Sequence, residues 1–302
     1  MSFSNNVKSE LISAVTDYDK KYACLYGMLL FCKRFTSDEI CFQSENNDVA
    51  GAFYSYVTEL FRNSVKIKKE ESVRKNGTVL YSIIIEDSES VKKITDTFKI
   101  DPKYKEIDLK NIDNNSISCF VAGVFLSCGS VTNPEAEYHL EFVISGRQLY
   151  SDLSAVLKSF GLSDKLVMRK NSWILYFKES ENIEDLLTFM GAQNSTLELI
   201  NVKIFKDVRN RVNRVSNCDL ANCSKTIEAG IRQKQDIELI DQKLGLDSLP
   251  GTLQEIALLR IENPEMSLKE LGEMFDPPLG RSGVNHRLKR LAQIADGLRG
   301  NN

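Results

Sequence analysis

Cysteine and histidine are the residues of this chain that could carry nucleophilic or zinc chemistry. Only two histidines occur, His139 and His286, which leaves little material for a histidine-based active site. The number of cysteines is odd and no Cys-x-x-Cys pair occurs, so the spacing predicts neither a disulfide framework nor a zinc site. We expect structural thiols that pack as small hydrophobes. The cysteines are Cys24, Cys32, Cys41, Cys119, Cys128, Cys218 and Cys223.

Side chains suited to phosphate binding gather between residues 203 and 234, although the formal net charge of the whole chain is -3. Basic residues outnumber acidic residues in this run, and its centre, RNRVNRVSN, interleaves Arg with Asn and Val. Arg and Asn readily contact phosphates and base edges. The alternative is a solvated helix face, which charge runs commonly form. The residues predicted to bind DNA here are Arg209, Arg211, Asn213 and Arg214.

Three helices are predicted near the C-terminus. Capping boxes of Thr252 with Glu255 and of Ser267 with Glu270 predict the starts of the first two. A third helix is expected from about Ser282, after a turn over residues 276–281 that is longer than usual for a helix-turn-helix. Its apolar stripe is predicted to consist of Val284, Leu288, Leu291 and Ala295.

The opposite face of the third helix carries cationic and amide side chains. Two helices that hold such a helix against the major groove are typical of a helix-turn-helix. A small three-helix domain that binds protein is the alternative. The residues predicted to contact DNA are Arg281, Ser282, Asn285, His286, Lys289 and Arg290, with Arg287 on a flank of the helix.

A duplicated unit in the first two hundred residues must position any site there. RKNGTVLYS begins at Arg74 and RKNSWILYF begins at Arg169, an offset of 95 positions. Cys32 and Cys128 end two similar apolar stretches and are 96 positions apart. Two matches at consistent spacing predict a repeat rather than chance similarity.

Each repeat is predicted to contain the same series of elements: an apolar helix, a strand, an amphipathic helix, a hairpin and a closing helix. The predicted ranges are 22–32, 39–44, 48–61, 65–85 and 89–98 in the first repeat. In the second repeat, the apolar helix is expected at 118–128, a strand at 138–144, and later helices at 147–160 and 183–190. A polar linker, 101–115, joins the repeats.

The apolar helices carry glycine at their centres, Gly27 and Gly123. A helix that is hydrophobic on all sides must be buried, and a central glycine allows two backbones to approach closely. We therefore expect the two helices to pack together around a pseudo-twofold axis, with the two sheets forming one saddle. The alternative is two ordinary core helices in unrelated places.

These helices resemble the LAGLIDADG motif of homing endonucleases. VAGVFLSCGS, residues 121–130, resembles the motif, and LYGMLLFCK, residues 25–33, resembles its first copy. In those enzymes the last acid of each motif holds magnesium at the scissile phosphates; here the matching positions are Cys32 and Cys128. A thiol is a poor magnesium ligand, so the resemblance implies a retained fold without an enzyme, metal or other cofactor. The acids just downstream, Asp38, Glu39, Glu135 and Glu137, are the alternative ligands.

Over nearly its whole length the chain resembles the WhiA family of Gram-positive bacteria. The most specific stretches are NRVSNCDLANCSKTIEAGIRQ and SLKELGEMFDPPLGRSGVNHRLKRL. The resemblance implies a sequence-directed protein that binds double-stranded DNA, regulates transcription, and is involved in cell division, chromosome segregation and, in sporulating relatives, sporulation. An adaptor that docks on a sigma factor, or a residually active endonuclease, is the alternative.

The expected fold is an α+β N-terminal domain with an all-α C-terminal domain. The predicted segments are the first LAGLIDADG-like repeat at 1–100, the second at 112–200, a basic helical connector at 201–245 and the helix-turn-helix at 246–302. The chain has no apolar run long enough to cross a membrane and no apolar signal core at its start. We therefore expect a cytoplasmic, nucleoid-associated protein with no membrane partner and no small-molecule substrate.

Overall fold

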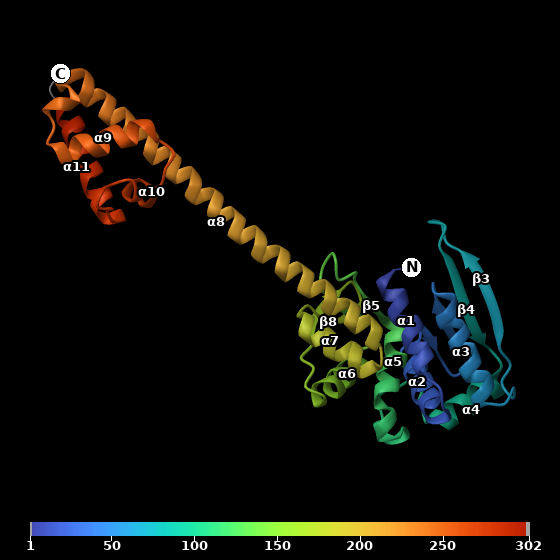
Figure 1. The fold of residues 1–302 in the computed structure, drawn as a ribbon. Helices are drawn as coiled ribbons and strands as arrows, with labels where there is room; N and C mark the ends of the chain where they lie inside the picture. The colour runs from blue at the N-terminus through green and yellow to red at the C-terminus, as the bar shows by residue number, and fades with distance from the viewer. Residues whose placement is uncertain (1, 300–302) are drawn as a thin grey trace. The chain divides into compact units, whose positions relative to one another are not determined.

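The computed structural model describes residues 2–299. The chain divides into two compact units, Met1–Lys206 and Asp207–Asn302, which we call unit 1 and unit 2 and describe separately (Figure 1). Unit 1 is α+β and unit 2 is all-α, which confirms the predicted fold class. Among residues 2–299, no helix combines the length and the apolar character needed to cross a bilayer.

Unit 1 contains two repeats with the same order of elements. The first repeat consists of α2 (Tyr18–Leu30), β1 (Arg34–Phe35), β2 (Ile40–Ser44), α3 (Asn47–Leu60), β3 (Lys68–Val73), β4 (Val79–Ile85) and α4 (Ser88–Phe98). The second consists of α5 (Ile117–Cys128), β5 (Gly129–Val131), β6 (Leu140–Ile144), α6 (Arg147–Ser159), β7 (Lys165–Arg169), β8 (Ser172–Phe177) and α7 (Ser180–Met190). The two antiparallel sheets have equivalent strand orders, β1-β2-β4-β3 and β5-β6-β8-β7. This equivalence confirms the repeat.

Five elements of unit 1 were not predicted from the sequence. Helix α1 (Phe3–Ala14) precedes the first repeat and buries Phe3, Val7 and Leu11. Strands β1 and β5 add an edge to each sheet. Two short 3-10 helices, η1 (Leu109–Asn111) and η2 (Asn114–Ser116), lie in the predicted linker.

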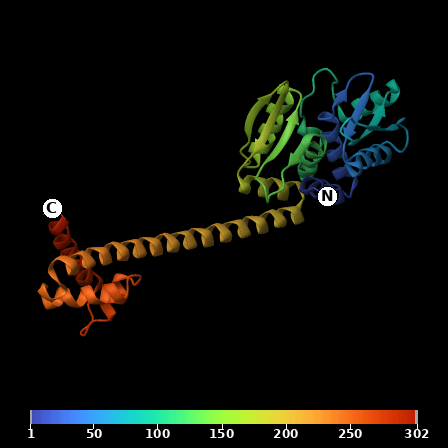
Figure 2. The same cartoon turned by 90° about the horizontal axis from the view of Figure 1, so that it is seen from above.

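Helices α2 and α5 pack against each other at the centre of unit 1. In Figure 2, the strands of the second repeat (green to yellow) lie on one side of α5 and the first repeat (blue to cyan) lies on the other. A Cβ atom on Gly27 would lie 2.4 Å from the Phe120 carbonyl oxygen, and one on Gly123 would lie 2.0 Å from the Cys24 carbonyl oxygen. Only glycine permits this approach, so the predicted pairing of the two helices is confirmed.

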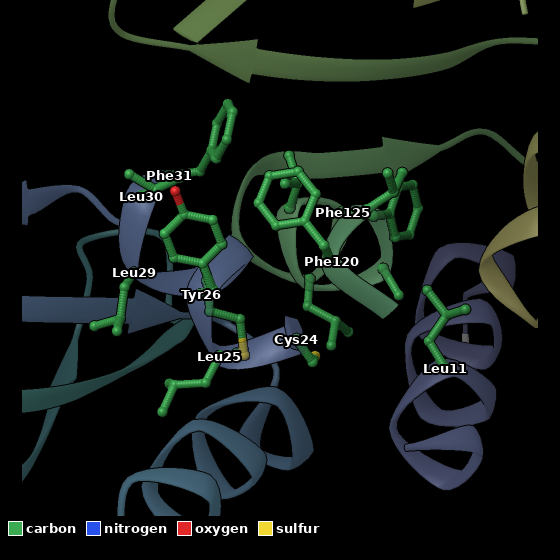
Figure 3. Close-up of a cluster of buried hydrophobic side chains, with 14 of the residues drawn as sticks. Leu11, Cys24, Leu25, Tyr26, Leu29, Leu30, Phe31, Phe120 and Phe125 are labelled. Atoms are coloured by element: carbon green, nitrogen blue, oxygen red, sulfur yellow. The ribbon is translucent and has the colours of Figure 1, made fainter. Parts of the chain in front are cut away.

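The core around this helix pair is aromatic and aliphatic (Figure 3). Tyr26 lies between Phe98, stacked at 6.0 Å, and Phe120, tilted at 5.4 Å between ring centroids. The Tyr26 hydroxyl accepts a hydrogen bond from the Asp108 backbone N–H at 3.0 Å, which fixes the linker onto the core. The predicted burial of both apolar helices is confirmed, because every residue from Ala23 to Leu30 and from Cys119 to Leu126 is buried.

Helix α8 (Gln193–Leu244) begins in unit 1 and supplies the first helix of unit 2. The other elements of unit 2 are η3 (Leu246–Ser248), α9 (Gly251–Glu262), α10 (Leu268–Glu273) and α11 (Arg281–Arg299). Buried residues from α8, α9, α10 and α11 form one core, among them Ile237, Ile256, Leu271 and Leu288. The end of α8 is therefore part of the unit that contains α11.

One predicted capping box is confirmed and one is wrong. Ser267 caps α10 in a complete capping box with Glu270. Thr252 and Glu255 form no such box, because α9 already begins at Gly251 and its N-cap is Pro250, which has no side-chain cap. Proline fixes its own backbone angle and can start a helix without a side-chain acceptor, so Thr252 lies inside the first turn.

Candidate functional site

The two motif cysteines lie at the ends of the central helices. Cys128 is the last residue of α5, and Cys32 follows α2 by two positions. Cys32 Sγ donates to the Arg34 carbonyl oxygen at 3.2 Å, and Cys128 Sγ donates to the Val124 carbonyl oxygen at 3.4 Å. Burial raises the pKa of each thiol to about 12. Both groups are therefore neutral at physiological pH, and a neutral thiol is a poor nucleophile and a poor ligand.

A lysine accompanies each of these thiols. Lys105 is close enough to Cys32, and Lys8 to Cys128, for electrostatic interaction, and burial lowers the pKa of both lysines. Lys105 Nζ donates to the Leu30 carbonyl oxygen at 3.4 Å. The lysines are 97 positions apart, close to the offset of the repeat. Lysines therefore lie near both thiols, at the positions that the resemblance matches to the last acids of the endonuclease motif.

The cavity beside Cys32 and Cys128 has a volume of about 430 Å³. Its polar lining includes Lys33, Glu45 and Arg74, and Glu45 forms an ion pair with Arg74. Sequence reasoning missed Glu45, because the residue immediately after a strand carries no pattern that shows which way it points. Four other acids were the alternative metal ligands in the sequence analysis. Glu39 pairs with Arg34 at 2.8 Å, and Asp38, Glu135 and Glu137 are exposed.

The residues of this cavity do not fit a magnesium site. Magnesium requires near-octahedral oxygen ligands, usually with one or two carboxylates free to bind it. The carboxylate of Glu45 is already paired with Arg74. Within residues 2–299, no group of three or more His, Cys, Asp or Glu side chains could hold a metal ion.

Helix α11 has one apolar face and one polar face. Val284, Leu288, Leu291 and Ala295 are all buried, which confirms the predicted stripe. Six of its polar residues contribute to the other side of the helix. Arg281, Ser282, His286, Lys289 and Arg290 are exposed, and Asn285 is half-buried.

The side chain of Arg287 contacts other parts of unit 2 and is not part of the exposed face of α11. Its guanidinium lies 5.1 Å from the centroid of the Phe275 ring, and its Nη1 donates to the Thr252 carbonyl oxygen at 3.5 Å. These contacts connect α11 to α9 and to Phe275, two positions after the end of α10. Arg287 therefore serves to position the helix.

The four predicted DNA-binding residues of α8 do not lie on one face. All four are exposed. At 3.6 residues per turn, Arg209 and Asn213 fall on one side of the helix and Arg211 and Arg214 fall on another. Residues that are continuous in the sequence of this basic run therefore point to two different sides of α8.

Comparisons with known proteins match both units. The family model for the WhiA LAGLIDADG-like domain matches residues 117–209, and the model for the WhiA C-terminal HTH domain matches residues 212–295. A protein of Clostridium perfringens strain 13 named "Probable cell division protein WhiA" is 40% identical over 321 aligned positions, covering 100% of both chains. A protein of the same name from Clostridium botulinum strain Hall is 41% identical and covers 99% of each chain. The crystal structure of full-length WhiA from Thermatoga maritima matches with a TM-score of 0.58 and 28% identity, covering 98% of each chain.

Proposed function

This chain belongs to the WhiA family, and from that premise we propose that it is a sequence-directed protein that binds double-stranded DNA through unit 2. The observation that supports the proposal is the exposed face of α11. Arg281, Lys289 and Arg290 form no ion pair with any residue among 2–299. Unpaired cations on a helix held by a rigid scaffold are suited to the phosphates and base edges of a major groove.

We assign base contacts to the segment of α11 from Asn285 to Arg290. Asn285 and Lys289 are four positions apart and therefore neighbours on the helix, with His286 and Arg290 one position further along. Asn is suited to bidentate contact with adenine, and Lys and Arg to contact with guanine. Arg281 and Ser282, in the first turn, would contact the backbone.

The α8 residues play a supporting part in this proposal. Arg209, Arg211, Asn213 and Arg214 would contribute attraction to the duplex from two sides of the helix. Several basic side chains of the hairpins of unit 1 differ from them because they are paired with acids: Lys68 with Glu86, Arg74 with Glu45, and Lys165 with Glu179. We therefore place the saddle second to unit 2 as a contact for phosphates.

We further propose that unit 1 does not cleave DNA. Its motif-end thiols are neutral at physiological pH and are accompanied by lysines, as described above. The rival proposal, a residual endonuclease, requires magnesium-dependent nicking of duplex DNA by the purified protein. Nicking by wild-type protein that disappears in a Glu45→Gln variant would establish that rival.

The cellular role we propose follows the names of the relatives, which are cell division proteins. The finer proposal is a regulator of transcription that contributes to cell division, to chromosome segregation and, in spore-forming species, to sporulation. A unit 2 that docks on a sigma factor is the main alternative. Such an adaptor would bind that protein without salt-sensitive affinity for DNA.

The test is genome-wide mapping of DNA bound by the wild type and by a Lys289→Ala/Arg290→Ala variant. We expect discrete sites for the wild type and their loss in the variant, because each well-placed base contact supplies about 1–3 kcal/mol of discrimination. The matched control is Arg209→Gln/Arg211→Gln/Arg214→Gln, which should keep the preferred sites but bind all sequences more weakly. Equal site occupancy in the wild type and the Lys289→Ala/Arg290→Ala variant would contradict the assignment of α11 as the reading helix.

A further inference from the structure

Unit 2 contains a polar groove between α8 and the helices that follow it. Its volume is about 680 Å³. Helix α8 supplies Asn222, Lys225 and Thr226 to one wall, and Lys269, Arg281 and Asn285 line the other. The groove is thus lined both by the first turns of α11 and by a part of α8 that is distant from them in the sequence.

The charge of this groove is entirely positive. Lys225, Lys269 and Arg281 come from three different helices, and none of the lining residues in the described chain is acidic. Lys225 and Arg281 form no ion pair with any residue among 2–299. Lys269 pairs only loosely with Glu273, at 3.8 Å on the exposed surface. An anion that entered the groove would therefore meet cations from both walls.

The base of the groove is fixed. A Cβ atom on Gly230 would lie 1.8 Å from the Pro264 carbonyl oxygen, so glycine allows α8 to touch the loop between α9 and α10. Arg260, 1% exposed, holds that loop from inside. Its Nη1 donates to the carbonyl oxygens of Asn263, Pro264 and Met266 at 3.1, 3.3 and 2.8 Å. The two walls therefore form one rigid unit.

The floor also has unused hydrogen-bonding capacity. Arg260 lines the groove, and its buried Nε has no partner within the described residues. The buried Oε1 of Gln233, another lining residue, also lacks a partner there. Buried polar groups without partners are uncommon in proteins and are costly unless a ligand or water satisfies them. The groove is thus a prepared polar site rather than a gap between helices.

We propose that this groove binds a backbone phosphate of the duplex that α11 reads, with Lys225 of α8 and Lys269 of α10 on either side of it. The inference rests on the proposed function. Arg281 and Asn285 line the groove and also lie in the first turns of α11, the part of a recognition helix that faces base edges, so the adjoining DNA backbone would pass beside the groove. The phosphodiester group matches the groove because it is anionic and accepts hydrogen bonds from Lys, Arg and Asn. Helix α8 would then belong to the DNA-binding module.

The test compares Lys225→Gln and Lys269→Gln with Arg232→Gln in the full chain. Arg232 is an exposed cation on α8 that does not line the groove, so it controls for the loss of one charge. Affinity for a fluorescent duplex of mixed sequence would be measured over a series of salt concentrations. Each groove variant should flatten the plot of log affinity against log salt by about one, because one phosphate contact is lost. Arg232→Gln should leave the slope close to that of the wild type.

The outcomes separate this inference from the proposed function. Steep salt dependence in the wild type, with Lys225→Gln and Lys269→Gln indistinguishable from Arg232→Gln, would overturn the groove assignment alone. No salt-sensitive binding by the wild type would overturn the proposed function and the groove with it. Thermal melting of each variant identifies any loss of affinity that comes from unfolding. A slope change in folded Lys225→Gln establishes the contact from α8.

Discussion

The paired helices of unit 1 and the helix α11 of unit 2 use apolar residues in opposite ways. In α5 every residue from Cys119 to Leu126 is buried, so the helix has no face left for a partner. In α11 only one stripe is buried, and the remaining surface is polar and cationic. A helix buried on all sides is committed to structure, whereas an amphipathic helix on a scaffold can present a recognition surface.

Within the central helices of unit 1, the glycines that allow packing are separate from the cysteines at the helix ends. Gly27 and Gly123 sit where the two backbones touch, and they are needed for packing whatever the helix ends do. Cys32 and Cys128 lie at or beyond the helix ends, away from this close approach. The close approach therefore depends on the glycines and not on Cys32 or Cys128.

The largest effect we expect comes from Gly123→Ala. The new Cβ would lie 2.0 Å from the Cys24 carbonyl oxygen, and a backbone atom in a closely packed helix pair cannot move aside cheaply. We expect unit 1 to lose about 4 kcal/mol of stability or more, in the range that marks severe core disruption. Urea unfolding followed by circular dichroism would measure it.

Gly51→Ala is the matched control. Gly51 also lies inside a helix, α3, but a Cβ there would meet nothing within 4 Å. Alanine should therefore stabilise unit 1 by roughly 0.5–1 kcal/mol through its better helix propensity. Similar unfolding curves for the two variants would break the comparison, because the helix pair would then not depend on glycine.

The next effect concerns the reactivity of the cysteines. Burial raises the pKa of Cys32 and Cys128 from 9.0 to about 12, which lowers the thiolate fraction about a thousandfold below that of an ordinary thiol. Cys218 and Cys223 are exposed on α8. Iodoacetamide at pH 8 should therefore label the α8 pair quickly and the motif pair far more slowly until the protein unfolds. Peptide mass mapping over time would follow each site.

The same shift predicts a pH dependence of stability. A thiol whose pKa is raised in the folded state favours folding fully below the unfolded value of 9.0. That contribution is lost as the pH rises from about 9 towards about 12. A Cys32→Ala/Cys128→Ala variant should lose less stability than the wild type over this range. Rapid labelling of Cys32 in the folded protein would show that the helix ends are open rather than buried.

The fold of unit 1 was predictable because its repeat is written into the sequence. Two matches at offsets of 95 and 96 predicted that the elements repeat, and the central glycines predicted that the two apolar helices pack together. Strands β1 and β5 were missed because strands of two or three residues cannot show alternation. Helix α1 was missed although Phe3, Val7 and Leu11 recur at helical spacing, the pattern that predicted α11.

The candidate site was less predictable than the fold. The exposed face of α11 followed from helical spacing, but the partners of Cys32 and Cys128 did not. Lys8 and Lys105 come from an unpredicted helix and from the linker between the repeats, so only tertiary structure brings them to the thiols. The groove beside α11 was hidden for the same reason, because its cations lie far apart in the chain.

The smallest effect we expect is in the scaffold of unit 2. The Ser267 side chain accepts from the Glu270 N–H at 3.3 Å, and Glu270 accepts from the Ser267 N–H at 2.8 Å. Ser267→Ala removes one half of this capping box and should cost about 1 kcal/mol. Helix α10 is only one of the two helices behind α11, so the affinity for DNA should fall little if the core of unit 2 remains intact. Thermal unfolding and duplex binding would both be measured.

Thr252→Ala is the control that sharpens this prediction, because the sequence offers Thr252 and Ser267 as equivalent caps. Thr252 lies inside α9 with no capping bond, so alanine there should be neutral or slightly stabilising. An equal loss of stability in both variants would show that α9 starts at Thr252 in solution and that Pro250 does not replace a side-chain cap. A loss confined to Ser267→Ala would show that α11 rests on a scaffold whose stability depends on local hydrogen bonds. The helix pair of unit 1 depends instead on the close approach of two backbones.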